Sequence, residues 1–426
     1  MEAIATKSTI QKYPAYKDSG QDWLGVIPEH WSLKRLGSHF EERKTKVSDK
    51  DFAPLSVTKQ GILPQLDSAA KTNDGDNRKL VKKGDFVINS RSDRKGSSGI
   101  ANEDGSVSLI NIVMKPKSIN LSFCNYLLKS NAFVEENYRI GHGIVSDLWT
   151  TRYDEMKNIK IGIPSPTEQT AIATFLDDKT AKIDRAIAQK EKMIALLKER
   201  KQIIIQNAVT KGLDPNAKMK HSGVEWIGEI PEGYTITKLG LCLKPVSIKN
   251  QPELPLLSIT RELGVIVRDT EDQEANHNFI PDDLSGYKVI KAGQFGMNKM
   301  KAWQGSYGVS KFDGIVSPAY YVFDLISDIN PDFFHLAIRS KIYVPFFAAA
   351  SDGVRIGQWD LNKSRMKEIP LVIPPIEEQL KAIVFIENQS EKIERAIAKQ
   401  ELQIEKLKEL KSTLIDSAVT GKIKVS

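Results

Sequence analysis

The chain has 426 residues, of which 40% are hydrophobic and 27% charged, a soluble globular composition, and its length exceeds what one hydrophobic core usually serves, so two or more domains are expected. Its two cysteines, Cys124 and Cys242, are far apart and outside any Cys-x-x-Cys pair, which excludes a disulfide framework and a cysteine zinc site. The net charge of +7 permits an anionic partner, but residues 213–376 carry 18 basic and 19 acidic side chains, so charge alone does not identify nucleic acid.

No apolar run approaches the roughly 20 residues that cross a bilayer, and the first 20 residues lack the apolar core of a signal peptide. We therefore expect a cytoplasmic protein without a membrane-spanning segment.

The sequence repeats itself at an offset that drifts from 202 to 210 residues. The last parts of the two copies, residues 168–210 and 378–420, align without a gap and are identical at 19 of 43 positions. The shorter matching segments keep their order along the chain: Trp23–Glu29 with Trp226–Glu232, Leu55–Thr58 with Leu257–Thr260, Lys83–Asn89 with Ala292–Asn298, Gly96–Gly99 with Gly305–Gly308, and Ile163–Gln169 with Ile373–Gln379. A duplicated architecture follows.

The first part of each copy reads as a mixed α/β domain. Short β-rich segments such as Asp85–Asn89 and Val107–Val113 alternate with Gly, Asn and Asp turn signals, and a more helical segment, Leu121–Glu136, follows. Gly84, Gly99 and their partners Gly293 and Gly308 are expected at turns that need a small residue or a positive φ.

The last part of each copy predicts one long helix that begins after prolines, at Pro164-Ser-Pro166 and at Pro374-Pro375. Apolar residues spaced alternately by four and three predict a coiled-coil seam about 60–65 Å long in each copy. We expect the two helices to pack antiparallel. The apolar seam residues are Leu176, Ile183, Ile187, Ile194, Leu197, Ile204, Ile386, Ile393, Ile397, Ile404, Leu407 and Leu414.

Polar residues interrupt both seams at corresponding places, Lys190 with Gln400 and Lys201 with Lys411. Buried, they would fix the register of the helices. Alternatively, the lysines extend to solvent at the edge of the seam.

Catalytic motifs are missing from the sequence. It has no phosphate-binding Gly-x-x-x-x-Gly-Lys-Ser/Thr loop, no His-x-x-x-His pair, no Gly-x-Ser-x-Gly elbow and no tetrapeptide of the amino-methyltransferase type. We expect neither an enzyme active site nor a metal site in this chain, although a weakly marked nuclease carboxylate cluster stays open.

Two variable α/β domains, each introduced by Trp-x-Gly-x-Ile-Pro-Glu and followed by Ile-Pro-x-x-x-Glu-Gln and a long helix ending Ala-Val-Thr, resemble the specificity subunit of type I restriction-modification enzymes. The likeness runs from Tyr16 to Ile423. It implies two target-recognition domains, each reading one half of a split double-stranded DNA sequence, with the helices setting the spacer and docking the partners.

The resemblance also implies a non-catalytic chain without its own cofactor. Two modification subunits would carry adenine methylation with S-adenosylmethionine, and restriction subunits would carry translocation and cleavage with ATP and magnesium. The expected fold is mixed α/β, with two recognition domains separated by two long helices that form an antiparallel coiled coil. The expected boundaries are 1–20 for an N-terminal segment, 21–166 and 213–376 for the recognition domains, and 167–212 and 377–426 for the helices, the last with the tail.

Loops at equivalent places in the two domains are the candidate DNA contacts, because Arg fits guanine and Gln fits adenine. Trp149 and Trp359 also align and are interpreted as domain core rather than as base-stacking groups. The candidates are Arg91, Arg94, Lys95, Lys299, Lys301 and Gln304 in one pair of loops, and Thr58, Lys59, Thr260 and Arg261 in a second.

Two alternatives remain from the sequence. One is a coiled-coil scaffold with two protein-binding domains, and the other is a self-contained nuclease or methylase. Salt-dependent DNA binding would separate DNA recognition from the scaffold. The bases recognised, the spacer length and the oligomeric state do not follow from the sequence.

Overall fold

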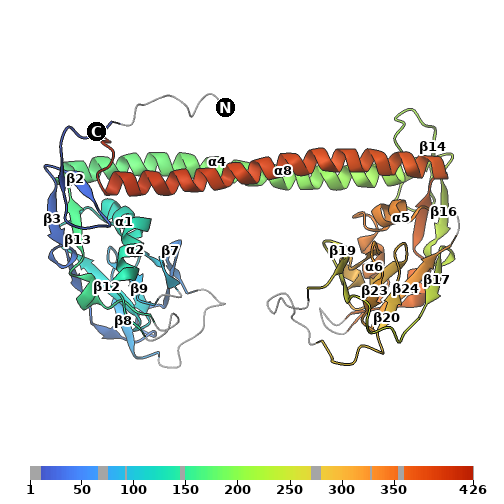
Figure 1. The fold of residues 1–426 in the computed structure, drawn as a ribbon, viewed down its shortest axis with the longest axis horizontal. Helices are drawn as coiled ribbons and strands as arrows, with labels where there is room; N and C mark the ends of the chain where they lie inside the picture. Colours follow the sequence, from blue (N-terminus) through green and yellow to red (C-terminus); the bar gives the residue numbers. More distant parts are fainter. Residues whose placement is uncertain are drawn as a thin grey trace. The chain divides into compact units, whose positions relative to one another are not determined.

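The computed structural model describes residues 11–65, 75–91, 94–143, 149–269, 280–326, 329–353 and 359–425. The chain forms two compact units, unit 1 with Met1–Lys190 and Glu401–Ser426, and unit 2 with Glu191–Gln400 (Figure 1). Each unit thus combines one variable region with parts of both long helices.

Unit 1 is built around a four-stranded antiparallel sheet of order β10-β9-β12-β4, beside a three-stranded sheet β11-β8-β5. In the central pair, Val87 of β9 lies opposite Val113 of β12. The strands of unit 1 are β1 (Tyr16–Asp18), β2 (Val26–Pro28), β3 (Ser32–Arg35), β4 (Phe40–Glu42), β5 (Lys46–Val47), β6 (Leu55–Thr58), β7 (Gly61–Pro64), β8 (Arg78–Val81), β9 (Phe86–Asn89), β10 (Ser98–Ile100), β11 (Gly105–Val107), β12 (Asn111–Pro116) and β13 (Lys160–Ile163).

Unit 2 repeats this arrangement with a four-stranded sheet of order β22-β21-β24-β17. In both units two hairpins and a strand pair flank the sheet, β1-β2, β6-β7 and β13-β3 in one and β14-β15, β18-β19 and β16-β27 in the other. The strands of unit 2 are β14 (Met219–His221), β15 (Glu229–Pro231), β16 (Thr235–Lys238), β17 (Leu243–Val246), β18 (Leu257–Thr260), β19 (Gly264–Val267), β20 (Lys288–Ile290), β21 (Phe295–Asn298), β22 (Tyr307–Val309), β23 (Gly314–Val316), β24 (Tyr320–Leu325), β25 (Ser351–Asp352), β26 (Asp360–Leu361) and β27 (Pro370–Ile373). The mixed α/β repeat expected from the sequence is confirmed.

Short helices cover the sheets, and their starts are capped by polar side chains. Asn120 accepts the N–H of Phe123, Ser130 accepts that of Phe133, and Asn330 caps the helix that begins at Pro331. The short α-helices are α1 (Leu121–Lys129), α2 (Asn131–Arg139) and α3 (Tyr153–Met156) in unit 1, and α5 (Pro331–Ile338), α6 (Val344–Ala349) and α7 (Lys363–Lys367) in unit 2.

Two expectations about local structure are corrected. The apolar segment Val107–Val113 is not one strand, because a turn at residues 108–110 separates β11 from β12. The helical segment Leu121–Glu136 is two helices, because Ser130 is in an extended conformation and caps the second of them.

The two long helices are α4 (Pro166–Thr210) and α8 (Ile376–Val419); α4 begins at the last proline of its motif and α8 directly after Pro375. In unit 1 the Lys411 amine lies 2.7 Å from the Asp184 carboxylate, and Lys190 donates to Gln403. In unit 2 the Lys201 amine lies 2.8 Å from the Glu394 carboxylate.

The direction of packing follows from these pairs. In unit 1 the pairs are Asp184 with Lys411 and Lys190 with Gln403, so residue numbers rise along α4 as they fall along α8. In unit 2, Ile205 and Ala208 near the end of α4 pack with Ala382 and Ile386 near the start of α8. The antiparallel pairing is therefore confirmed in each unit.

All twelve predicted apolar seam residues are buried or half-buried. The seam lysines combine the two interpretations. Lys201 and Lys411 keep 27% and 32% of their side chains exposed, and each reaches a carboxylate of the opposite helix, at positions that correspond in the repeat. They therefore act at the edge of the seam as interhelical ion pairs.

A buried glutamine joins each domain to its long helix through the same pair of hydrogen bonds in both units. Gln169 accepts the N–H of Asn120 at 2.8 Å and donates to the carbonyl of Pro164 at 3.0 Å. Gln379 makes the same bonds in unit 2, to the N–H of Asn330 at 2.9 Å and the Pro374 carbonyl at 2.9 Å. The second residue of the Glu-Gln motif thus ties the start of the long helix to the cap of the first short helix.

Within the part of the chain that the structure describes, no helix is long and apolar enough to cross a membrane. The two cysteines are buried free thiols.

Candidate nucleic-acid interface

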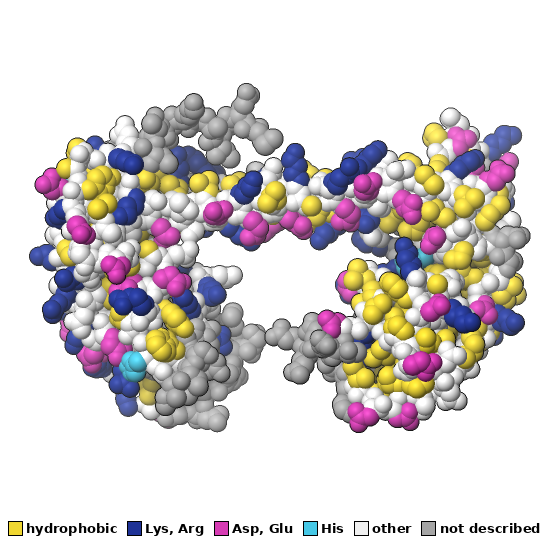
Figure 2. Space-filling model, viewed as in Figure 1, with side chains coloured by type: hydrophobic (Ala, Val, Ile, Leu, Met, Phe, Trp, Pro, Cys, Tyr) yellow, Lys and Arg dark blue, Asp and Glu magenta, His cyan; other side chains and the backbone are white. Residues whose placement is uncertain are grey.

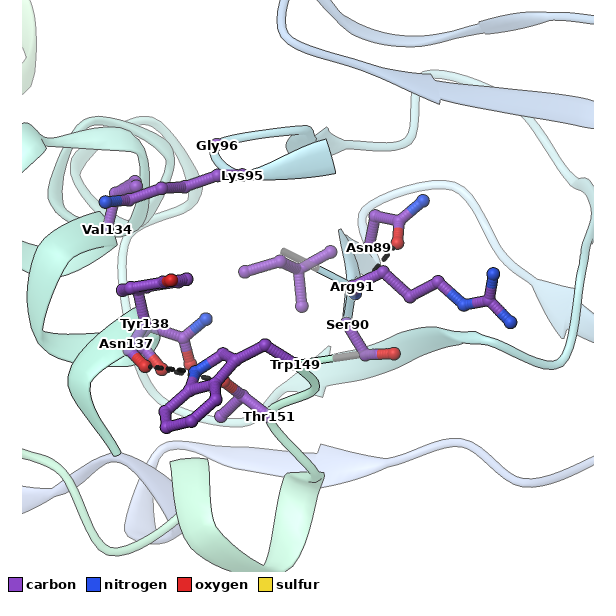
Figure 3. Close-up of a pocket in the computed structure, with 11 residues that line it drawn as sticks. Asn89, Ser90, Arg91, Lys95, Gly96, Val134, Asn137, Tyr138, Trp149 and Thr151 are labelled. Atoms are coloured by element: carbon purple, nitrogen blue, oxygen red, sulfur yellow. Dashed lines mark hydrogen bonds between the residues drawn. The ribbon is translucent and has the colours of Figure 1, made fainter. Parts of the chain in front are cut away.

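The first candidate loop follows β9 in unit 1 and is anchored by its own strand end. The Asn89 side chain accepts the N–H of Arg91 at 3.1 Å, and Ser90 donates its hydroxyl to the carbonyl of Ile110 at 2.6 Å. This turn holds Arg91 at the surface, with its side chain extending away from Trp149 (Figure 3). Ser92 and Asp93 of this loop lie outside the described residues.

Lys95 closes the loop and is held from two sides. Its amine lies 2.7 Å from a carboxylate oxygen of Glu135 and 4.3 Å from the centre of the Tyr138 ring, and Figure 3 shows its side chain beside that ring. An ion pair and a cation–π contact already engage this cation. Contact with DNA would therefore require Lys95 to exchange these partners, whereas Arg91 and Arg94 are exposed.

Trp149 lines a small pocket together with Arg91, Lys95 and Tyr138. Its indole N–H donates to the Tyr138 carbonyl at 2.9 Å, and the two rings lie 5.8 Å apart. A Cβ on Gly141 would come within 2.6 Å of the indole nitrogen. Trp149 is thus packed into the domain in this state, as is Trp359 of unit 2, whose ring lies 5.1 Å from that of Trp303.

The equivalent loop of unit 2 uses the same anchor with different side chains. The Asn298 side chain accepts the N–H of Met300 at 3.1 Å, so Met300 occupies the place of Arg91. Lys299 lies 2.9 Å from Asp360, and this hydrogen bond raises the pKa of the Lys299 amine. Lys301 is exposed and Gln304 half-buried.

The second pair of candidate loops are hairpin turns. The Thr58 hydroxyl donates to the Gly61 carbonyl at 2.9 Å and the Thr260 hydroxyl to the Gly264 carbonyl at 3.2 Å. Both hydroxyls therefore close their own turns, and the exposed Lys59 and Arg261 are the side chains these turns present.

In each unit the hairpin lies against the loop region. A Cβ on Gly99 of β10 would lie 3.1 Å from the Cα of Gly61, and a Cβ on Gly305 would lie 4.0 Å from the Cγ of Arg261. Gly305 has a φ of 96°, which explains the glycine there. Each unit thus gathers its two groups of candidates at one place.

Sequence reasoning missed several residues of these surfaces. Met300 and Leu263 expose 48% and 68% of their surface beside the predicted cations, and Arg339 of unit 2 binds the β18-β19 turn and the first residue of β22, which follows the other loop. The alignment of Met300 with Arg91 could have pointed to the first. The described residues contain no group of three or more His, Cys, Asp or Glu side chains placed to hold a metal ion.

Comparison with known proteins gives consistent matches. Residues 28–194 match the family described as the type I restriction modification DNA specificity domain. The chain is 21% identical over 300 residues to the type I restriction enzyme EcoDI specificity subunit of Escherichia coli, a match that spans 65% of this chain and 64% of that protein.

A second relative matches along almost its whole length. The chain is 25% identical over 442 aligned positions to the type I restriction enzyme MjaX specificity subunit of Methanocaldococcus jannaschii, covering 94% of this chain and 96% of that protein. Among solved structures, a chain from a study of the assembly and conformational transition of the type I R-M system has the same fold, with a TM-score of 0.63 and 12% identity over 92% of this chain and 98% of that one. Residues 28–194 thus match a type I restriction modification DNA specificity domain, and the chain as a whole is similar to specificity subunits of type I restriction enzymes.

Proposed function

We propose that this chain is the DNA-specificity subunit of a type I restriction-modification complex, in which each recognition domain reads one half of a bipartite double-stranded target. The proposed reading domains are residues 21–166 and 213–376. The observation that carries the proposal is the shared turn at Asn89 and Asn298, which presents Arg91 in one unit and Met300 in the other. A conserved frame with exchanged side chains suits two readers of different base sequences.

Exposed cations next to these positions suit the phosphate backbone. Lys59, Arg94, Arg261 and Lys301 are exposed beside the two groups of loops. Neutralised phosphates release counterions, so binding should weaken steeply with salt. The scaffold alternative offers no reason for such residues at equivalent places in both domains.

The chain is proposed to be non-catalytic, as the family is, and to work in the cytoplasm with the DNA it reads. Two modification subunits would supply S-adenosylmethionine-dependent adenine methylation. Restriction subunits would supply ATP- and magnesium-dependent translocation and cleavage.

The long helices offer apolar surface for such partners. In unit 2, Met193, Leu196 and Ile203 of α4 are 48%, 49% and 52% exposed and lie at the three-and-seven spacing of a helical stripe. Figure 2 shows yellow apolar side chains between charged ones along the helices. We propose that a helix of a modification subunit covers this stripe.

Two experiments test these proposals. Co-expression with modification subunits from the same genome, followed by single-molecule mapping of adenine methylation, should reveal one bipartite motif. The absence of any sequence-specific methylation or DNA binding would contradict DNA recognition.

For the partner surface, the triple variant Met193→Glu, Leu196→Glu, Ile203→Glu should lose co-purification with modification subunits. Lys198→Glu, on the far side of the same helix from Leu196, should retain it. Equal retention by both variants would refute the docking site.

A further inference from the structure

Arg339, at the end of α5 in unit 2, joins the two candidate reading loops of that unit. Its Nη2 donates to the carbonyls of Arg261 and Glu262 in the β18-β19 turn at 2.9 and 2.8 Å. Its Nη1 donates to the carbonyl of Tyr307 at 2.5 Å, and the carbonyl of Gly305 lies 3.5 Å away. One planar guanidinium thus binds backbone from two separate segments.

Glycines open the path for this side chain. A Cβ on Gly264 would lie 3.3 Å from Nη1 of Arg339, and a Cβ on Gly308 would lie 3.4 Å from its Cδ. A side chain at position 264 would require the arginine to shift by a few tenths of an ångström, and the φ of 74° there also favours glycine, whereas the contact with Arg339 at position 308 is ordinary packing.

His335, one turn earlier on α5, supports the same arrangement. Its Nδ1 accepts the N–H of Val309 at 3.1 Å. Burial, and then the positive charge of Arg339, lower the pKa of His335 to about 4. The imidazole is therefore neutral at neutral pH and adds no second positive charge beside the guanidinium.

The segments that Arg339 joins carry the candidate reading side chains. The hairpin carries Arg261 and the exposed Leu263, and the loop that ends at Gly305 carries Met300 and Gln304. The Arg261 and Glu262 carbonyls belong to the hairpin turn, and Gly305 and Tyr307 directly follow the other loop, so loss of the guanidinium would release these two segments from each other.

Among the described residues, this arrangement is found in unit 2 and has no counterpart in unit 1. The repeat aligns Arg339 with Lys129 and His335 with Asn125. Lys129 makes no hydrogen bond to the described loops of unit 1, and burial, followed by the charge of Lys411, lowers the pKa of its amine. A perturbation of Arg339 is therefore expected to affect one recognition domain only.

We infer that Arg339 is a positioning residue that fixes the two reading loops of unit 2 relative to each other and so sets the base preference of the half-site that this unit reads. The inference rests on the proposed DNA-recognition function. Arginine suits the task because its fixed fork of donors can serve several carbonyls at once, whereas lysine offers a single flexible amine.

The test is the methylation motif of the complete complex with wild-type chain, Arg339→Ala, Arg339→Lys and the control Lys341→Ala. Lys341 is an exposed cation two positions further along the chain. We expect Arg339→Ala to lower discrimination against wrong bases in one half-site by about tenfold or more, with the other half-site unchanged. Arg339→Lys should be intermediate, and Lys341→Ala should match wild type.

Unchanged discrimination in Arg339→Ala, or an equal loss at both half-sites, would overturn the inference, because the latter is what destabilisation of the whole complex gives. If Arg339→Ala does not fold, Arg339→Lys is judged by the same criteria. Failure of the proposed function is distinguishable, since the wild-type complex itself would then give no bipartite motif.

Discussion

Replacement of the buried glutamine of the Glu-Gln motif by methionine should uncouple a recognition domain from its long helix. Gln169 is 3% exposed and Gln379 is fully buried. Methionine has nearly the same length and fills the space, but it can neither accept from the backbone of Asn120 or Asn330 nor donate to a proline carbonyl. The variant therefore tests the hydrogen bonds without creating a large cavity.

The magnitude follows from the groups left without partners. Each substitution leaves one half-buried N–H and one buried carbonyl without their partner, at about 1–3 kcal/mol each. We expect Gln169→Met and Gln379→Met each to lower the unfolding free energy of the unit that contains it by about 2–6 kcal/mol. The losses should be similar, because the bond lengths in the two units differ by no more than 0.1 Å.

Urea unfolding followed by tryptophan fluorescence measures this loss, because each unit contains three of the six tryptophans. Gln189→Met, at an exposed position of α4, is the control and should be nearly neutral. Losses no larger than that of the control, or a large loss in one unit only, would refute the argument that this amide is the shared joint.

Three further predictions follow from the structure. The pKa of His335 is lowered from 6.5 to about 4 in the folded chain, so on acidification the unfolded chain takes up a proton first. Acidification from pH 6.5 to 4 should therefore lower the unfolding free energy of unit 2 by up to about 3 kcal/mol. Urea titrations across this range should show a weaker pH dependence in His335→Asn. Arg91→Met should weaken a guanine preference in one half-site and Met300→Arg should create one in the other, as read from the methylation motif, and unchanged motifs would remove these positions from the reading surface. Insertion of seven residues in each long helix, after Lys190 and before Glu401, adds about 10.5 Å to the helix pair. The DNA spacer should lengthen by roughly three base pairs, while the recognised bases stay the same. An unchanged spacer in the methylation map would refute the proposal that the helices set the spacer length.

The repeat and the heptad seam were readable from the sequence because both depend on spacing. Seam residues such as Ile183 and Ile393 are buried where the periodicity places them. The turn between β11 and β12 was not readable, since Leu109 and Ile110 continue the apolar run although they are exposed. Local composition resembles a strand there, and only the pairing of β12 with β9 fixes where the strand begins.

The candidate site was only partly predictable for a different reason. The sequence predicted Arg91 and Arg261 as candidate contacts because basic residues in loops can be recognised from residue type alone. It gave no sign that the Thr58 and Thr260 hydroxyls close turns, or that Glu135 already holds Lys95, since those partners are distant in sequence or belong to the backbone. The role of Arg339 could not be predicted from the sequence, because its partners are backbone carbonyls, which every residue has.

The same distinction explains how a duplicated chain can serve two different targets. What the copies share are backbone contacts made by side chains: the Asn89 and Asn298 turns and the Gln169 and Gln379 joints. These contacts leave the neighbouring side chains free, so the exchange of Arg91 for Met300 costs the scaffold little. Unit 2 has Arg339 where unit 1 has Lys129, and Arg339 adds backbone contacts of its own. We infer that a change of specificity requires new support for the loops as well as new side chains at their tips.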